Sequence, residues 1–189
     1  MRKKAKREKN THPLSPQWLM ALAFLLAILT GAFLLALPAA NTDGQWRDAV
    51  SAIFTATSAT CVTGLTVIDI GSELTRFGQL VVLTLIQLGG LGVTTFGTFL
   101  LVLVGRRLSV QSEFVLMDAY GVEAVQGIRA LLLWTMGFTL LFEGIGTFLL
   151  WTRYLAPPSS LALTPDPWTA LYYASFHAVS AFCNAGFSL

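Results

Sequence analysis

The chain has 189 residues, of which 54% are hydrophobic and 12% are charged, and its formal net charge is +2. Soluble domains usually carry about 25% charged residues, so this composition argues against a water-soluble fold. The basic residues gather at residues 2–9 with no basic stripe elsewhere, which argues against nucleic-acid binding, and two cysteines are too few for a disulfide framework.

The first predicted element is a basic cytoplasmic tail, residues 1–17. Three later segments are apolar enough to cross a bilayer, which needs about 20 residues, and they cover residues 18–37, 77–104 and 130–151. The first segment also fits a secretory signal peptide, but its apolar stretch exceeds the roughly 7–15 residues of a signal core. We therefore expect it to be retained as a spanning helix.

The positions of Lys and Arg predict the orientation, because cytoplasmic flanks carry an excess of both residues. The tail and the pair Arg106-Arg107 are expected inside, which leaves residues 41–76 outside. Residues 105–128 then form a cytoplasmic connector that includes an amphipathic helix, and the proline-rich segment 156–167 is an outer loop. This pattern predicts a multi-pass protein of the cell membrane with a cytoplasmic N-terminus.

An internal repeat is the most informative feature of the sequence. Residues 54–65 align with residues 176–187 at an offset of 122, and six of the twelve positions are identical. The identical residues of the first copy are Phe54, Ala56, Ser58, Ala59, Cys61 and Gly64. We expect a first repeat over residues 18–104 and a second over residues 129–189 that lacks its last helix.

Each copy of the repeat is predicted to contain a short helix that enters the membrane and stops. Thr42-Asp43 precede the first, over 44–58, and Asp166-Pro167 precede the second, over 168–181, as helix-start signals. A helix of about 14 residues rises only about 21 Å. The turn that follows is tolerated at membrane depth only where protein buries it or a water-filled path runs past it. The predicted fold class is therefore an all-α membrane protein of helix, re-entrant pore loop and helix repeats, as in potassium channels.

The two turns are candidates for binding a dehydrated monovalent cation, because rings of backbone carbonyl oxygens can replace its hydration shell. Glycine reaches positive φ without a Cβ clash, and the C-terminal end of a short helix carries about half a negative charge. A plain turn is the alternative for both glycines. The candidate filter residues are Cys61, Val62, Thr63, Gly64, Cys183, Asn184, Ala185 and Gly186.

Several other residues have a structural and a functional interpretation. Glu143, the one acid in the third span, is expected to be a structural hydrogen-bond partner of a short helix rather than an ion ligand. We interpret Cys61 and Cys183 as small apolar residues, with a disulfide as the alternative. His177 is expected to be a packed histidine, with titration as the alternative. The glycines of residues 89–97 favour close helix packing over a hinge.

These motifs together resemble the Trk/Ktr/HKT superfamily of potassium transporters, most closely the Ktr-type membrane subunit. The resemblance is carried by TSATCVTGL at 57–65, QLGGLG at 87–92, GRRL at 105–108 and CNAGF at 183–187. It implies four such repeats around one pore, potassium as the transported ion and sodium as a coupling ion. It also implies a homodimer and a cytosolic nucleotide-binding regulatory subunit, with Gly64 and Gly186 as filter glycines.

The family pattern continues beyond this sequence, which stops three residues after Gly186. We therefore expect the 189 residues to be the N-terminal portion of a membrane subunit for potassium uptake. The alternative is a non-conducting membrane assembly protein that contributes pore-loop halves to other subunits. An enzyme is not expected, because the membrane segments contain no paired carboxylates and no pairing of a nucleophile with a base.

Overall fold

The computed structural model describes residues 16–92, 95, 125–155 and 166–189. The chain is helical in these ranges, where a single isolated bridge, between Asn41 and Leu74, is the only strand-like pairing. The all-α prediction is therefore confirmed for the described residues. The helices are α1 (Pro16–Ala36), α2 (Ala49–Thr60), α3 (Ile70–Glu73), α4 (Arg76–Leu91), α7 (Val125–Leu155) and α8 (Pro167–Phe182), with a short 3-10 helix, η1, at Pro38–Ala40.

One described helix, α7, contains a segment long and apolar enough to cross a membrane, Leu132–Leu155. The apolar part of α1, Met20–Ala36, and helix α4 are shorter. Helix α4 stops at Leu91 because Gly92 adopts a φ of 80°. The predicted unbroken span over 77–104 is therefore wrong at Gly92, and residues 96–104 lie outside the described part of the chain.

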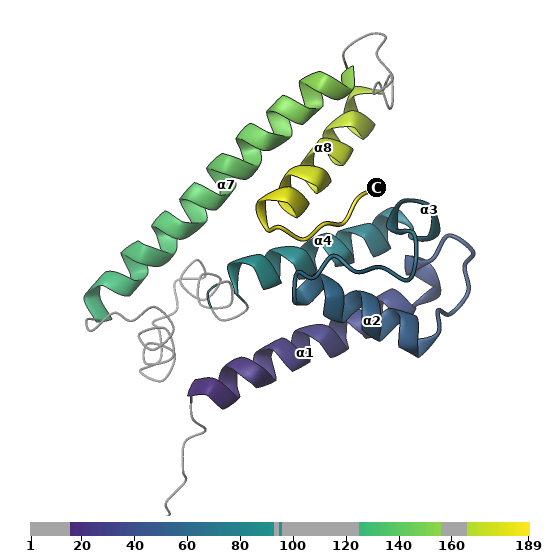
Figure 1. Ribbon diagram of the computed structural model, residues 1–189, viewed down its shortest axis with the longest axis horizontal. Coiled ribbons are helices and arrows are strands. Elements are labelled where there is room, and N and C mark those ends of the chain that lie inside the picture. The colour runs from purple at the N-terminus through teal and green to yellow at the C-terminus, as the bar shows by residue number, and fades with distance from the viewer. Residues whose placement is uncertain (1–15, 93–94, 96–124, 156–165) are drawn as a thin grey trace, which may run out of the picture.

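The helices pack in two groups, and α8 of the second group contributes to the core of the first. Helix α1 lies against α2 and α4, α7 lies against α8, and α8 contacts α4 (Figure 1). Phe176 of α8 is fully buried in the same cluster as Leu35 of α1 and Val82 of α4. The Tyr172 hydroxyl also donates a 2.9 Å hydrogen bond to Gln79 Oε1, which ties α8 to α4. The two repeats are thus held together by both apolar and polar contacts.

The outward faces of α1 and α7 carry large exposed apolar side chains. Phe33 on α1 and Trp134 and Phe148 on α7 are examples. Apolar faces of this extent on a soluble monomer would be unusual, whereas helices that meet lipid or further membrane helices require them. Helix α7 begins at Val125, so residues 125–128 belong to that helix and the predicted end of the connector at 128 is wrong. Residues 105–124 of the connector, which include the GRRL motif, lie outside the described residues, as do most of the basic tail and most of the outer loop.

Candidate ion-binding turns

The first short helix, α2, begins later than predicted. Its N-cap is Asp48, whose carboxylate Oδ1 accepts a 2.9 Å hydrogen bond from the Ser51 amide. The predicted start at 44 is wrong because Asp43 closes a tight turn rather than capping the helix. Its Oδ1 accepts from the Gln45 amide at 2.9 Å, and Gly44 between them has a φ of 66°. The chain therefore completes a tight turn before the helix starts.

The second short helix, α8, begins as predicted. Asp166 is its N-cap and accepts a 2.9 Å hydrogen bond from the Thr169 amide, with Pro167 in the first turn. The two helices have 12 and 16 residues. They rise about 18 Å and 24 Å, and both fall short of the roughly 30 Å hydrocarbon core. The predicted short length of both helices is therefore confirmed.

The turns after the two helices have the same backbone conformation. Gly64 and Gly186 adopt φ values of 75° and 73°, so the predicted positive φ at both glycines is confirmed. Val62 and Asn184 also adopt positive φ values, of 56° and 57°, which were not predicted. Asparagine tolerates the left-handed region, whereas a β-branched valine is strained there.

Equivalent hydrogen bonds close the two turns. The Thr63 amide donates to the Ser58 carbonyl oxygen at 3.0 Å, and the Ala185 amide donates to the Ser180 carbonyl oxygen at 2.7 Å. The serine hydroxyls also reach their own segments. Ser58 Oγ lies 2.8 Å from Thr63 Oγ1, and Ser180 Oγ donates to the Phe187 carbonyl oxygen at 2.7 Å. Identity of the serines within the repeat was the signal available for this role.

The two turns lie against each other. A Cβ built on Gly64 would be 2.8 Å from the Ala185 carbonyl oxygen, and one built on Gly186 would be 3.4 Å from the Gly64 Cα. Backbone atoms do not move aside cheaply, so a side chain at residue 64 displaces one turn from the other. The repeat therefore brings its two glycine turns together in space.

Helix α4 forms a wall behind both turns. A Cβ on Gly89 would collide with the Thr60 carbonyl oxygen at the end of α2. A Cβ on Gly90 would lie 2.5 Å from Cys183 Sγ at the end of α8. The predicted close packing through these two glycines is confirmed, because each lets α4 approach the end of one short helix.

The remaining candidates are placed as follows. Cys61 and Cys183 are both free thiols, so the disulfide alternative is wrong. The His177 ring is packed: its Nδ1 lies 2.7 Å from the Tyr173 carbonyl oxygen, and its Nε2 accepts from the Leu189 amide at 3.4 Å. Glu143 is buried and accepts a 2.9 Å hydrogen bond from Gln87 Nε2. Its partner therefore lies in α4 rather than in a short helix.

Comparison with known proteins identifies the family of this chain. Residues 7–189 match the family model TrkH, described as a cation transport protein. The chain belongs to the TrkH family. The resemblance inferred from the repeat and its motifs is therefore confirmed.

Curated relatives support the same assignment. The chain is 38% identical over 178 residues to the Ktr system potassium uptake protein B of Bacillus subtilis, which covers 93% of this chain and 37% of that protein. It is 35% identical to the potassium/sodium uptake protein NtpJ of Enterococcus hirae, covering 93% of this chain and 38% of that protein. The chain thus spans less than two fifths of the length of these relatives.

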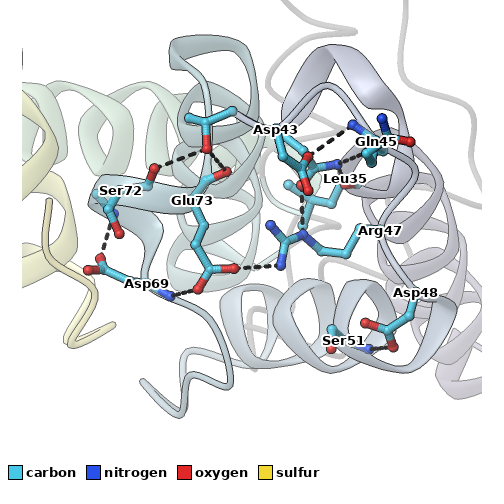
Figure 2. Close-up of polar contacts among 12 residues, drawn as sticks. Leu35, Asp43, Gln45, Arg47, Asp48, Ser51, Asp69, Ser72 and Glu73 are labelled. Atoms are coloured by element: carbon cyan, nitrogen blue, oxygen red, sulfur yellow. Dashed lines mark hydrogen bonds and ion pairs between the residues drawn. The ribbon is translucent and has the colours of Figure 1, made fainter.

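In this TrkH family member, a polar cluster of Asn41, Arg47, Asp69 and Glu73 fixes the segment that follows the first turn. Arg47 donates to Glu73 Oε2 at 3.0 Å and to Asn41 Oδ1 at 2.6 Å. Figure 2 shows Glu73 between Arg47 and the backbone of Asp69, whose amide donates to Glu73 Oε1 at 2.9 Å. The hydrogen bond from the Asp69 amide and the one from the Arg47 guanidinium hold the pKa of Glu73 below its usual value. Glu73 is therefore charged at neutral pH.

A polar cleft of about 400 Å³ opens over the two turns of the TrkH chain. Gly64 and Gly186 line it, together with Asp69 and Glu73 on its first-repeat side. Hydrogen bonds from Ser72 and from the Gly71 amide lower the pKa of Asp69. A larger groove of about 590 Å³ lies between α1 and α4, but its lining is almost entirely apolar. The cleft therefore places two carboxylates, those of Asp69 and Glu73, beside both glycine turns.

Proposed function

We propose that this chain carries the first two ion-binding turns of a membrane subunit for potassium uptake. The observation that carries the proposal is the contact between Gly64 and Gly186, which joins two turns of equal conformation. Family membership supports cation transport, and the names of the relatives support potassium as the ion. The NtpJ relative also names sodium, which supports sodium as a second or coupling ion.

In this proposal, the backbone carbonyl oxygens of residues 61–64 and 183–186 replace part of the hydration shell of potassium. Carbonyl rings of modest field strength suit a monovalent cation. The ends of α2 and α8 at Thr60 and Phe182 add the negative end of a helix dipole on the inner side. Asp69, which lines the cleft, raises the local concentration of cations before they enter.

We further propose the arrangement that the basic flanks and the family resemblance imply. Residues 41–76, which include the polar cluster of Asn41, Arg47, Asp69 and Glu73, face the outside, and the N-terminus lies in the cytoplasm. The subunit spans the cell membrane several times and forms a homodimer. A cytosolic nucleotide-binding subunit regulates it, and the name Ktr system, carried by the relatives, agrees with a system of more than one component.

The experiment is reconstitution in liposomes of a chain that carries these residues within four repeats. The expected result is a potassium flux that exceeds the sodium flux. Flux of neither ion, from protein that is folded and inserted, would contradict the proposal and would favour the non-conducting assembly role.

A further inference from the structure

Glu143 is placed where a carboxyl group can act on the second turn without touching an ion. It lies in the membrane-length helix α7 and is 7% exposed. Its Oε1 accepts a 2.9 Å hydrogen bond from Gln87 Nε2 of α4. An acid at membrane depth is costly unless it is paired, so a defined partner 56 residues away indicates a specific role.

The other end of the Gln87 amide faces the second turn. Gln87 Oε1 accepts from Cys183 Sγ at 4.0 Å, within the range for a thiol donor. The Gln87 amide thus receives its orientation from Glu143: because Nε2 donates to the carboxylate, Oε1 is left turned to the thiol. Glu143, Gln87 and Cys183 form a chain of contacts from α7 through α4 to the end of α8.

Packing at the same corner makes this contact tight. Gly90 lies on α4 three residues beyond Gln87, and a Cβ there would be 2.7 Å from Cys183 Cβ and 3.4 Å from Cys183 Cα. Cys183 is the C-cap of α8, and its amide bonds to the carbonyl oxygens of Val179 and Ala181. Movement of the Cys183 side chain therefore carries the start of the second turn with it.

We propose that Glu143 is a positioning residue for the second ion-binding turn, acting through the Gln87 amide on Cys183. This inference rests on the proposed function, because it assumes that residues 183–186 bind the ion. We infer that the hydrogen bond to Gln87 fixes the turn, because the hydrogen-bonded path from Glu143 to Cys183 runs through the Gln87 amide.

The test uses the two native thiols as reporters. Cys183 is half-buried, whereas Cys61, at the equivalent position of the first repeat, is exposed and serves as an internal reference. The membrane-inserted four-repeat chain is labelled with N-ethylmaleimide. Mass spectrometry of its peptides then measures how much of each cysteine is labelled. In Glu143→Leu, labelling of Cys183 relative to Cys61 should rise by roughly tenfold, the scale expected when one hydrogen bond to a charged group is lost.

Two further variants separate the hydrogen bond from folding and from charge. Glu143→Gln keeps an acceptor oxygen for Gln87 Nε2 and loses the carboxylate charge, so its Cys183 labelling should stay well below that of Glu143→Leu. Gln87→Met keeps the side-chain volume and loses the amide, so it should reproduce Glu143→Leu. Equal labelling in parent and Glu143→Leu would overturn the proposal. So would a Glu143→Gln variant that behaves as Glu143→Leu, because charge would then be the cause.

Ion selectivity is the second readout and separates this inference from the proposed function. The potassium-over-sodium flux ratio should fall in Glu143→Leu and in Gly186→Ser but stay at the parental level in Glu143→Gln. If Gly186→Ser lowers the ratio and Glu143→Leu does not, the positioning role fails and the filter stands. If Gly186→Ser leaves the ratio unchanged, the filter assignment fails whatever the labelling shows.

Discussion

Gly64 and Gly186 touch across the two repeats, with only 3.4 Å between the Gly64 Cα and a Cβ built on Gly186. Both adopt a φ close to 75°, at 75° and 73°. Glycine is therefore needed at both positions for two reasons: the backbone has a positive φ, and the other turn lies too close for a side chain. Two glycines that are 122 residues apart in the sequence are therefore in contact in the fold.

Exchanging the residue types at the second left-handed position should shift stability in opposite directions. Val62 and Asn184 share a φ near 57°, and only asparagine tolerates it well. Val62→Asn should raise the free energy of unfolding by about 1 kcal/mol because it relieves this strain. Asn184→Val should lower it by a similar amount. Thermal unfolding in detergent measures both, and a destabilised Val62→Asn would contradict the conformation described for the first turn.

Alanine at Gly89 should destabilise the protein, because its Cβ would collide with the Thr60 carbonyl oxygen. Overpacking of this kind typically costs about 1–3 kcal/mol. Gly144 in α7 is the matched control, since a Cβ there meets nothing within 4 Å. Gly144→Ala should be neutral or stabilising by up to about 1 kcal/mol, because alanine is the better helix former. Equal unfolding temperatures for the two variants would argue against α4 as the wall behind the turns.

The proposed topology predicts which introduced thiols an impermeant maleimide reaches from outside. Ser72 is exposed in α3, within the outer segment 41–76, and Ser72→Cys should label in intact cells. Ser109→Cys, in the connector predicted to be cytoplasmic, should label only after the membrane is opened. Peptide mapping separates these thiols from Cys61 and Cys183. External labelling at residue 109 would reverse the orientation.

Acid should weaken the polar cluster of Asn41, Arg47, Asp69 and Glu73. The pKa of Glu73 is lower in the folded chain than its usual value, so its stabilising contribution is present above the unfolded-state pKa. It is lost as the pH falls through the lower, folded-state pKa. Unfolding temperature should therefore fall between about pH 5 and pH 3, a window that brackets the usual glutamate pKa of about 4.3. Glu73→Gln should reduce this pH dependence, and an unchanged profile in that variant would remove Glu73 from the acid response.

Local signals in the sequence predict the second short helix better than the first. Asp166 followed by Pro167 is an unambiguous start, and α8 begins there. Before α2, Thr42, Asp43 and Asp48 are all residues that favour an N-cap. Gly44 allows a tight turn after Asp43, and helix α2 therefore begins only after Asp48. Three candidate caps stand close together here, so the residue types alone do not say which of them begins the helix.

The repeat predicts the two glycine turns but not their supports. Identity at an offset of 122 marks Gly64 and Gly186, and their positive φ follows from the residue type. The positive φ of Val62 goes against its residue type, so only its equivalence to Asn184 would have indicated it. The pairing of Glu143 with Gln87 joins residues 56 apart and leaves no periodic signal. Long-range polar pairs of this kind come from tertiary structure alone.

The measurement that tests the central claim most directly is the potassium-over-sodium flux ratio of Gly64→Ser in four-repeat protein reconstituted in liposomes. Gly44→Ser is the matched control, because Gly44 also has a positive φ, 66°, but a Cβ there meets nothing within 4 Å. If the paired turns bind the ion, Gly64→Ser lowers the ratio more than it lowers the amount of inserted protein, and Gly44→Ser keeps the parental ratio. A parental ratio in Gly64→Ser would contradict the assignment of residues 61–64 as an ion filter.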